Sequence, residues 1–194
     1  ATSLLRDDPL WYKDAVIYEL HVRAFADSDG DGMGDFRGLT GKLDYLQDLG
    51  VTAVWLSAPY ENRNLAGAAI DPASDIHTYS GYHGYWPSPE NIDYSDPRNP
   101  TPRPAVESRI GTAADLHTFV DTAHGTTGAD GEPMKVLFDY VMNHVDIESG
   151  LYRAHDDWFA RRDGRFPLCG PDGLWDDPYW GLRCAFTDYL PAFD

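Results

Sequence analysis

What the sequence has little of already excludes several classes of protein. It contains no apolar run of transmembrane length, so we expect no membrane-spanning helix and no membrane partner. Basic residues are scarce, because 15 Lys and Arg stand against 32 Asp and Glu, and the formal net charge is -17. Nucleic acid is therefore not an expected partner, since binding phosphates needs a basic surface. An acidic surface suits a protein that acts on a neutral ligand or binds cations.

Cysteine is also scarce, and both copies, Cys169 and Cys184, lie in the same stretch rich in Gly, Pro and Trp. We expect them to form a disulfide that closes this loop, which predicts an extracellular or periplasmic location. Two free thiols in a cytosolic protein are the alternative. The chain starts at Ala1 without a signal-peptide pattern, so we expect that it was processed or trimmed.

The rest of the composition is that of a globular protein, with 42% hydrophobic and 13% aromatic residues. Apolar and β-branched runs predict strands, and apolar residues at helical spacing predict helices between them. This alternation predicts an α/β fold with a parallel sheet and right-handed crossovers. The expected strands cover residues 15–22, 51–56 and the start of 135–144, and the expected helices cover 39–49, 112–124 and 152–162.

The stretch KVLFDYVMNH, residues 135–144, combines a strand pattern with polar groups. Its apolar run, 136–138, is expected to be buried on both faces, as strands in parallel sheets are. Asp139, Asn143 and His144 follow at the carboxyl end, where α/β folds and barrels bind ligands. The stretch therefore indicates either a ligand site or a core strand that runs into an ordinary Asx turn.

The segment 27–35, DSDGDGMGD, places oxygen ligands at the spacing of a calcium-binding EF-hand loop. Gly38 stands where an EF-hand has its bidentate Glu, and a strand precedes the loop, so the EF-hand fold itself is excluded. Four carboxylates this close together would repel one another without a cation. We expect a calcium site here, with a solvated acidic turn as the alternative. The expected ligands are Asp27, Asp29, Asp31, the Met33 carbonyl and Asp35.

Residues 61–104 form a long segment whose many prolines exclude a regular helix. A loop of this length inside a compact domain is usually functional. Within it, YSGYHGYWP (residues 79–87) interleaves aromatic rings with glycines, which suits a flat apolar platform for a sugar face. The alternative is a loop packed down by its own aromatic side chains.

Four motifs, at residues 11–36, 80–87, 139–144 (D-x-x-x-N-H) and 190–194, together resemble the α-amylase family of glycoside hydrolases. They are similar to its oligosaccharide-acting members and trehalose synthases. The resemblance implies a (β/α)8 TIM barrel with a small domain inserted after the third strand. Residues 1–144 would then hold the first three strand–helix units, and 145–194 an irregular inserted domain. The barrel is incomplete in this chain.

The resemblance also implies roles for individual residues. Tyr85 would stack on the sugar in the cleavage subsite with Trp86 beside it, and His144 would hydrogen-bond the hydroxyls of that sugar. Asn143 would ligate calcium or brace the loop at the domain interface. Asp139 would be a buried organiser and not a catalyst.

One departure from the family pattern concerns a second calcium ion. The motif at 190–194 often carries an Asp at its third position, where this sequence has Ala192. The departure weakens the case for calcium at Asn143. It leaves the expected calcium site at residues 27–35 unaffected.

The resemblance implies retaining cleavage of α-glucosidic bonds in an α-glucan or maltooligosaccharide, carried out by two carboxyl groups. The family places these groups on later strands, so we expect no catalytic residue before Asp194 and the rest of the barrel on a second chain. A trehalose synthase or transglycosidase of the same family is one alternative. A non-catalytic barrel that serves as a binding or partner module is the other.

Overall fold

The computed structural model describes residues 10–63, 67–68, 78–79, 81–89, 92–102 and 106–194. It divides the chain into two compact units. Unit 1 comprises Ala1–Ser57 and Arg109–Asp139, and unit 2 comprises Ala58–Ser108 and Tyr140–Asp194. This division differs from the expected boundary at residue 144, because the segment after the second strand bonds to the C-terminal part of the chain.

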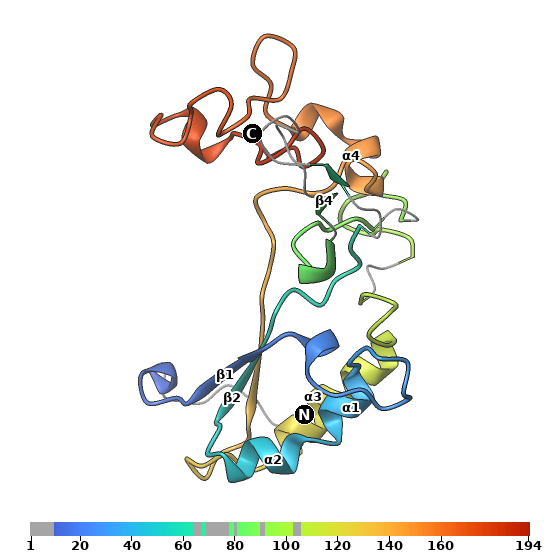
Figure 1. Cartoon of the computed structure of the whole chain (residues 1–194), viewed down its shortest axis with the longest axis vertical. Helices are drawn as coiled ribbons and strands as arrows, with labels where there is room; N and C mark the ends of the chain where they lie inside the picture. Colours follow the sequence, from blue (N-terminus) through green and yellow to red (C-terminus); the bar gives the residue numbers. More distant parts are fainter. Residues whose placement is uncertain (1–9, 64–66, 69–77, 80, 90–91, 103–105) are drawn as a thin grey trace. The chain divides into compact units, whose positions relative to one another are not determined.

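The sheet of unit 1 contains three parallel strands, in the order β1-β2-β5 (Figure 1). They are β1 (Ile17–Leu20), β2 (Ala53–Leu56) and β5 (Lys135–Phe138). The sequence analysis predicted each strand and the parallel pairing, and the structure confirms both. Two short 3-10 helices, η1 (Trp11–Lys13) and η2 (Val22–Ala24), flank β1.

The expected burial of β5 on both faces is wrong in this structure. Its side chains are only partly buried, and Phe138 is 42% exposed. β5 bonds to β2 alone, and the exposed Trp55 and Glu19 lie on the sheet face that carries Leu137. The apolar run therefore gave no guarantee of burial.

The helix expected over 39–49 consists of two short helices, α1 (Phe36–Thr40) and α2 (Leu43–Asp48). The break falls at Gly41 and Lys42, and Gly41 is a poor helix former. The predicted apolar face is confirmed at Leu39, Leu43 and Leu46, which are buried, whereas Leu49 is 53% exposed.

The helix expected over 112–124 is confirmed as α3 (Ala113–Gly125). It begins with a capping box, in which the side chains of Thr112 and Asp115 bond to each other's backbone N–H groups. α1 and α3 lie side by side (Figure 1), and the rings of Phe36 and Phe119 are 6.4 Å apart between centroids. Both rings are fully buried and form the centre of the unit 1 core.

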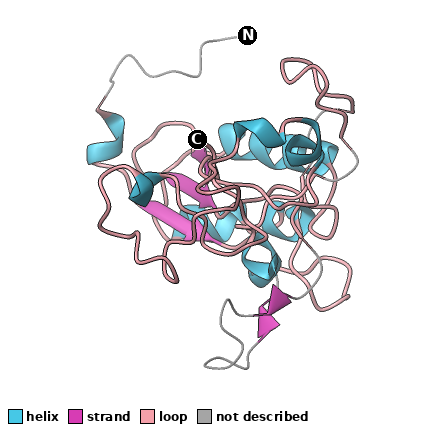
Figure 2. Ribbon diagram, turned by 90° about the horizontal axis from the view of Figure 1, so that it is seen from above, coloured by secondary structure: helices cyan, strands magenta, loops and turns pink. Residues whose placement is uncertain are grey.

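Unit 2 contains only short regular elements among its described residues. Loops and turns make up much of the described chain as a whole (Figure 2). The helix expected over 152–162 is wrong in extent, because α4 covers Gly150–Ala154. Ser149 caps its N-terminus by accepting a hydrogen bond from the N–H of Tyr152. The other elements are the antiparallel pair β3 (Gly67–Ala68) and β4 (Thr78–Tyr79), and the 3-10 helices η3 (Gly81–His83), η4 (Asp156–Trp158) and η5 (Trp180–Leu182).

The disulfide between Cys169 and Cys184 is present in unit 2, as predicted. Both sulfur-bearing residues are buried with Leu174, and Trp180 packs against them. Elsewhere in unit 2, His144 and Phe159 pair with the final segment through isolated bridges to Ala192 and Phe193.

Among the described residues, no helix has the length and apolarity needed to cross a membrane.

Candidate functional site

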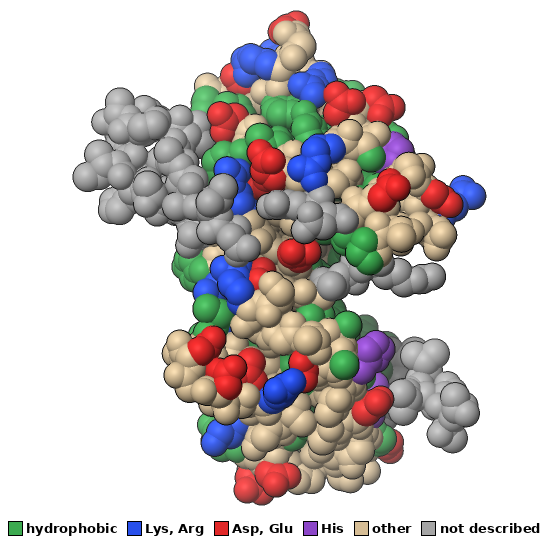
Figure 3. All heavy atoms as spheres, turned by 90° about the vertical axis from the view of Figure 1, so that its right-hand side faces the viewer, with side chains coloured by type: hydrophobic (Ala, Val, Ile, Leu, Met, Phe, Trp, Pro, Cys, Tyr) green, Lys and Arg blue, Asp and Glu red, His purple; other side chains and the backbone are tan. Residues whose placement is uncertain are grey.

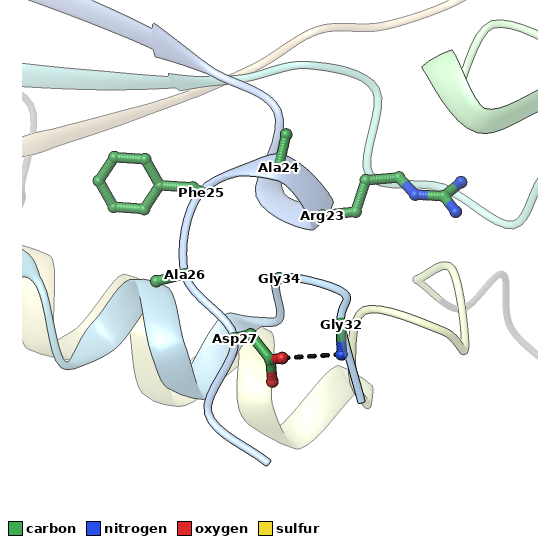
Figure 4. Close-up of a pocket in the computed structure, with 7 residues that line it drawn as sticks. All are labelled: Arg23, Ala24, Phe25, Ala26, Asp27, Gly32 and Gly34. Atoms are coloured by element: carbon green, nitrogen blue, oxygen red, sulfur yellow. Dashed lines mark hydrogen bonds between the residues drawn. The ribbon is translucent and has the colours of Figure 1, made fainter. Parts of the chain in front are cut away.

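The first candidate is the acidic loop of unit 1, residues 27–35. Asp27 accepts hydrogen bonds from the backbone N–H groups of Asp29 and Gly30 at 3.1 and 2.7 Å. It also accepts one from the N–H of Gly32 at 2.8 Å (Figure 4). These bonds lower the pKa of Asp27, and the bond from Gly30 contributes most to the lowering. Gly30 and Gly32 have φ values of 83° and 90°, which favour glycine, so the sequence DGDG sets the loop geometry.

Asp35 closes the same loop and begins α1. Its carboxylate accepts bonds from the N–H of Gly38 at 2.7 Å and of Ser28 at 2.8 Å. Partial burial acts to raise the pKa of Asp35, but the hydrogen bonds from Gly38 and Ser28 outweigh it and leave the pKa lowered. The carboxylate is therefore ionised at neutral pH.

Three of the predicted metal ligands converge. Asp27, Asp29 and Asp35 each place a carboxylate oxygen within 4.8 Å of the other two. Asp31 lies outside this group, and its Oδ1 accepts a bond from the N–H of Met33 at 2.7 Å. Converging carboxylate oxygens are the donors that a hard cation such as Ca²⁺ prefers. The donor set therefore fits the expected ion.

A cavity of about 240 Å³ lies beside the loop and is lined by residues from 23 to 27 with Gly32 and Gly34. Figure 4 shows the Asp27 carboxylate directed at the Gly32 N–H, whereas the Arg23 guanidinium points away from it. Gly34 leaves no room for a side chain, because an added Cβ would lie 2.2 Å from the Val22 carbonyl oxygen.

The second candidate is the aromatic cluster of unit 2, around residues 81–86. The ring of Tyr85 is 37% exposed, whereas Trp86 is buried. The His83 imidazole stacks on Tyr85, with 5.7 Å between centroids and 19° between planes, and meets Trp86 edge-on at 5.1 Å. Gly84 has a φ of 87°, and a Cβ there would lie 2.4 Å from the Ala58 carbonyl oxygen. The loop conformation thus exposes the Tyr85 ring, which stacks on His83, whereas Trp86 is buried.

His144 contacts the backbone of Tyr85 and is 6% exposed. Its Nε2 is 2.9 Å from the Tyr85 carbonyl oxygen, which can only accept, so Nε2 carries the proton. Nδ1 then accepts from the Asn143 Nδ2 at 3.3 Å. Burial lowers the pKa of His144, against the opposing effect of the Tyr85 bond, so the imidazole is neutral at neutral pH. The structure places His144 where it fixes the Tyr85 backbone.

Asn143 lies in unit 2 and Asp139 lies in unit 1. The Asn143 carbonyl accepts a bond from the N–H of Phe193 at 3.0 Å, which braces the final segment of unit 2. Both roles expected of Asn143, calcium ligation and bracing of the loop, stay predictions. In unit 1, the N–H of Asp139 donates to the Leu56 carbonyl at 3.0 Å. The expected burial of Asp139 is wrong here, because it lies partly exposed after an edge strand.

Unit 2 contains a buried ion pair that was not predicted from the sequence. Arg63 Nη1 is 3.0 Å from Asp146 Oδ2, and the Asp146 side chain is fully buried. Burial raises the pKa of Asp146, while the N–H of Glu148 and the Arg63 charge act in the opposite direction. The guanidinium also lies 4.8 Å above the centroid of the Tyr189 ring. Single charged residues in loops gave no sequence signal for this pairing.

Buried polar contacts of Asn62 were also missed. Its Oδ1 accepts a bond from the N–H of Trp86 at 2.7 Å, and its own N–H donates to Glu107 Oε2 at 3.1 Å. Asn62 and Glu107 are both buried.

On the face shown in Figure 3, the described acidic side chains lie among basic ones, so the -17 charge is not gathered into one patch there.

Comparisons with known proteins agree with this arrangement. The family model for the α-amylase catalytic domain matches residues 19–167. Trehalose synthases from Pimelobacter sp. (strain R48) and Thermus thermophilus are 33% and 36% identical, over 98% and 94% of this chain. These matches cover 27% and 15% of the relatives' own lengths.

An oligo-1,6-glucosidase from Parageobacillus thermoglucosidasius is 33% identical over 81% of this chain and 24% of its own length. Among solved structures, an α-amylase from Geobacillus thermoleovorans in complex with acarbose aligns with a TM-score of 0.59 and 26% identity. That alignment covers 94% of this chain and 34% of the amylase. The chain belongs to the α-amylase family, and it spans about a quarter of the length of the first curated relative that it matches.

Proposed function

We propose that this chain is the N-terminal part of an α-amylase-type glycoside hydrolase that cleaves α-glucosidic bonds in starch-like oligo- or polysaccharides with retention. The observation that carries the proposal is the exposed Tyr85 ring, which stacks on His83 and whose backbone carbonyl bonds to the buried His144. Such a fixed aromatic face suits the apolar side of a glucosyl ring.

The three parallel strands would be the first three of a (β/α)8 barrel, as family membership supports. Retaining cleavage uses a nucleophilic carboxylate that attacks the anomeric carbon while a carboxylic acid protonates the leaving oxygen. Water then releases the sugar from the covalent intermediate. We place both carboxyl groups outside this chain, in the remainder of the barrel.

This chain would bind and orient the glycone. Tyr85 would stack on the sugar ring, and Trp86 would fix the loop from below. For His144 to bond a sugar hydroxyl, its Nε2–H would exchange the Tyr85 carbonyl for the ligand oxygen, since both ring nitrogens have protein partners. Otherwise His144 acts by holding Tyr85.

Calcium would be held in the loop of unit 1 by Asp27, Asp29 and Asp35, joined by Asp31 and the Met33 carbonyl after a small rearrangement. The ion would neutralise the clustered carboxylates and fix the loop. Isothermal titration with Ca²⁺ should show one site that is lost in Asp29→Asn. Equal heats of binding for the wild type and Asp29→Asn would contradict calcium binding by this loop.

The proposed function predicts that Tyr85→Ala lowers kcat/KM for maltooligosaccharides by about 10- to 100-fold, which corresponds to about 1.4–2.7 kcal/mol. Release of reducing ends by the complete protein measures it. Tyr45→Ala is the matched control, because Tyr45 is an exposed tyrosine on α2. Activity unchanged in Tyr85→Ala would contradict the assigned role.

The disulfide supports an extracellular or periplasmic location. Recovery of the protein only from the cytosolic fraction would contradict it.

A trehalose synthase or transglycosidase is the second candidate, and the trehalose synthases that match over 94–98% of the chain favour it. Incubation with maltose separates the two, since an isomerase forms trehalose and a hydrolase forms glucose. A non-catalytic relative would bind maltooligosaccharides in the same assay without forming either product.

A further inference from the structure

We propose that Arg63 and Asp146 are a positioning pair that clamps the Trp86–Pro87 peptide and thereby sets the orientation of Tyr85 in the sugar site. The proposal rests on the proposed function, because it assigns a purpose to contacts around the glycone platform. The Asp146 side chain is fully buried and that of Arg63 is 16% exposed, so both would act through the aromatic loop.

The backbone contacts define the clamp. The N–H of Arg63 donates to the Trp86 carbonyl at 2.9 Å, and the N–H of Asp146 donates to the Pro87 carbonyl at 2.9 Å. The side chains of the same two residues then meet at 3.0 Å. Two adjacent carbonyls of the aromatic segment are therefore held between two residues that are themselves joined, which closes a ring of contacts.

The aromatic contacts extend the clamp to the Trp86 side chain. The Arg63 guanidinium lies on the Tyr189 ring, and that ring meets Trp86 edge-on at 5.2 Å and 75°. The Tyr189 carbonyl accepts a bond from the N–H of Ile147, next to Asp146. Trp86 is thus fixed from both its backbone and its ring, and through His83 it supports Tyr85.

The clamp also reaches His144, which lies two residues before Asp146 and bonds to the Tyr85 carbonyl. The segment 144–146 therefore contacts the aromatic loop at Tyr85 and at Pro87. A shift of Asp146 would move both contacts together. A displacement of about 1 Å in a group that orients substrate can reduce the rate about 100-fold.

A charged pair is not needed for folding alone. A buried ion pair is often no more stabilising than apolar residues of similar volume, although removal of one partner leaves a costly unpaired charge. The exposed pair Arg165–Asp172, in the same unit, has two contacts of 2.8 Å and does not touch the aromatic loop. It provides a matched control for the loss of an Arg–Asp pair.

The test compares four variants of the complete protein on maltotriose, at a temperature where thermal unfolding shows each to be folded. We expect Arg63→Met to lower kcat about 10- to 100-fold with KM changed less than about threefold, because orientation in the transition state is lost. Arg63→Lys should keep most of the wild-type kcat, since only one guanidinium nitrogen contacts Asp146. Arg165→Met should stay within about twofold of wild type.

The fourth variant, Arg63→Met with Asp146→Leu, separates positioning from folding. We expect its melting temperature to return close to that of wild type while kcat stays low. Recovery of kcat together with stability would overturn the positioning role and leave the proposed function intact. A wild-type protein without action on any α-glucoside would instead overturn the proposed function, and the inference with it.

Discussion

The two units of this chain are stabilised by different kinds of contact. Unit 1 contains strand ladders, leucines at helical spacing and the buried contact between Phe36 and Phe119. In unit 2, short elements are joined by the Arg63–Asp146 pair, aromatic edge contacts and the disulfide. Regular backbone bonding therefore organises unit 1, whereas individual side-chain partners organise unit 2.

This difference explains where each kind of function can be placed. The loop 27–35 of unit 1 is exposed, and its carboxylates are oriented by nearby N–H groups within the same loop. The aromatic cluster of unit 2 depends on partners tens of residues away, such as His144 for Tyr85. Local contacts suffice for a cation site, but an oriented ring needs support from several segments.

The largest effect that would test this contrast is expected from the unit 1 core. Phe119→Ala removes a fully buried ring and should cost about 3–5 kcal/mol of unfolding free energy. Hydrogen exchange should rise in α3 and leave residues 169–184 of unit 2 unchanged. Leu49→Ala is the control, since Leu49 is 53% exposed, and its cost should stay within about 0.5 kcal/mol. Equal deprotection of both units would break the contrast.

The next effect concerns the disulfide of unit 2. Replacing Cys169 and Cys184 together by serine opens a loop with a sequence separation of 15 residues, which should cost about 3 kcal/mol. Exchange should increase within 169–184 but not in α3. If the protein loses no stability, as measured by denaturant unfolding, the side-chain contacts of unit 2 suffice without the covalent link.

The smallest effect concerns the start of α3. The hydrogen bond from the Thr112 side chain, followed by that from Arg37, lowers the pKa of Asp115 to about 2. Since the folded pKa is depressed from 3.8, the stabilisation is present above pH 3.8 and is lost as pH falls through about 2. Asp115→Asn should cost about 0.3–1 kcal/mol at pH 6 and flatten the stability profile between pH 4 and pH 2, as followed by denaturant unfolding. The control is Asp121→Asn on the exposed side of the same helix, and a profile that stays steep in Asp115→Asn would contradict the assignment.

Much of unit 1 could be predicted from the sequence because its patterns are local. The spacing of Leu39, Leu43 and Leu46 and the Thr112–Asp115 capping box reflect contacts within a few residues. The exposed Phe138 was mispredicted because burial depends on what lies over a strand and not on the strand itself. Helix ends also shifted, as with α4, because Ser149 caps three residues earlier than the apolar pattern begins.

The candidate sites were predictable only in part. The motif residues Tyr85, Trp86 and His144 do lie together in unit 2, although the pairing of His144 with a carbonyl had no sequence signal. Three of the four expected acidic ligands converge, whereas Asp31 turns to its own loop. Arg63 and Asp146 were missed because ion pairing across 83 residues leaves no pattern in either segment.

The chain passes between the two units three times, because each unit is built from two separate segments. During synthesis, Arg63 therefore emerges well before its partner, which lies 83 residues later. At a translation rate of roughly 5–20 residues per second, the guanidinium waits about 4–17 s for Asp146. Unit 2 thus exists first as an unpaired half on the ribosome, and its assembly must follow, not accompany, the completion of the strands of unit 1.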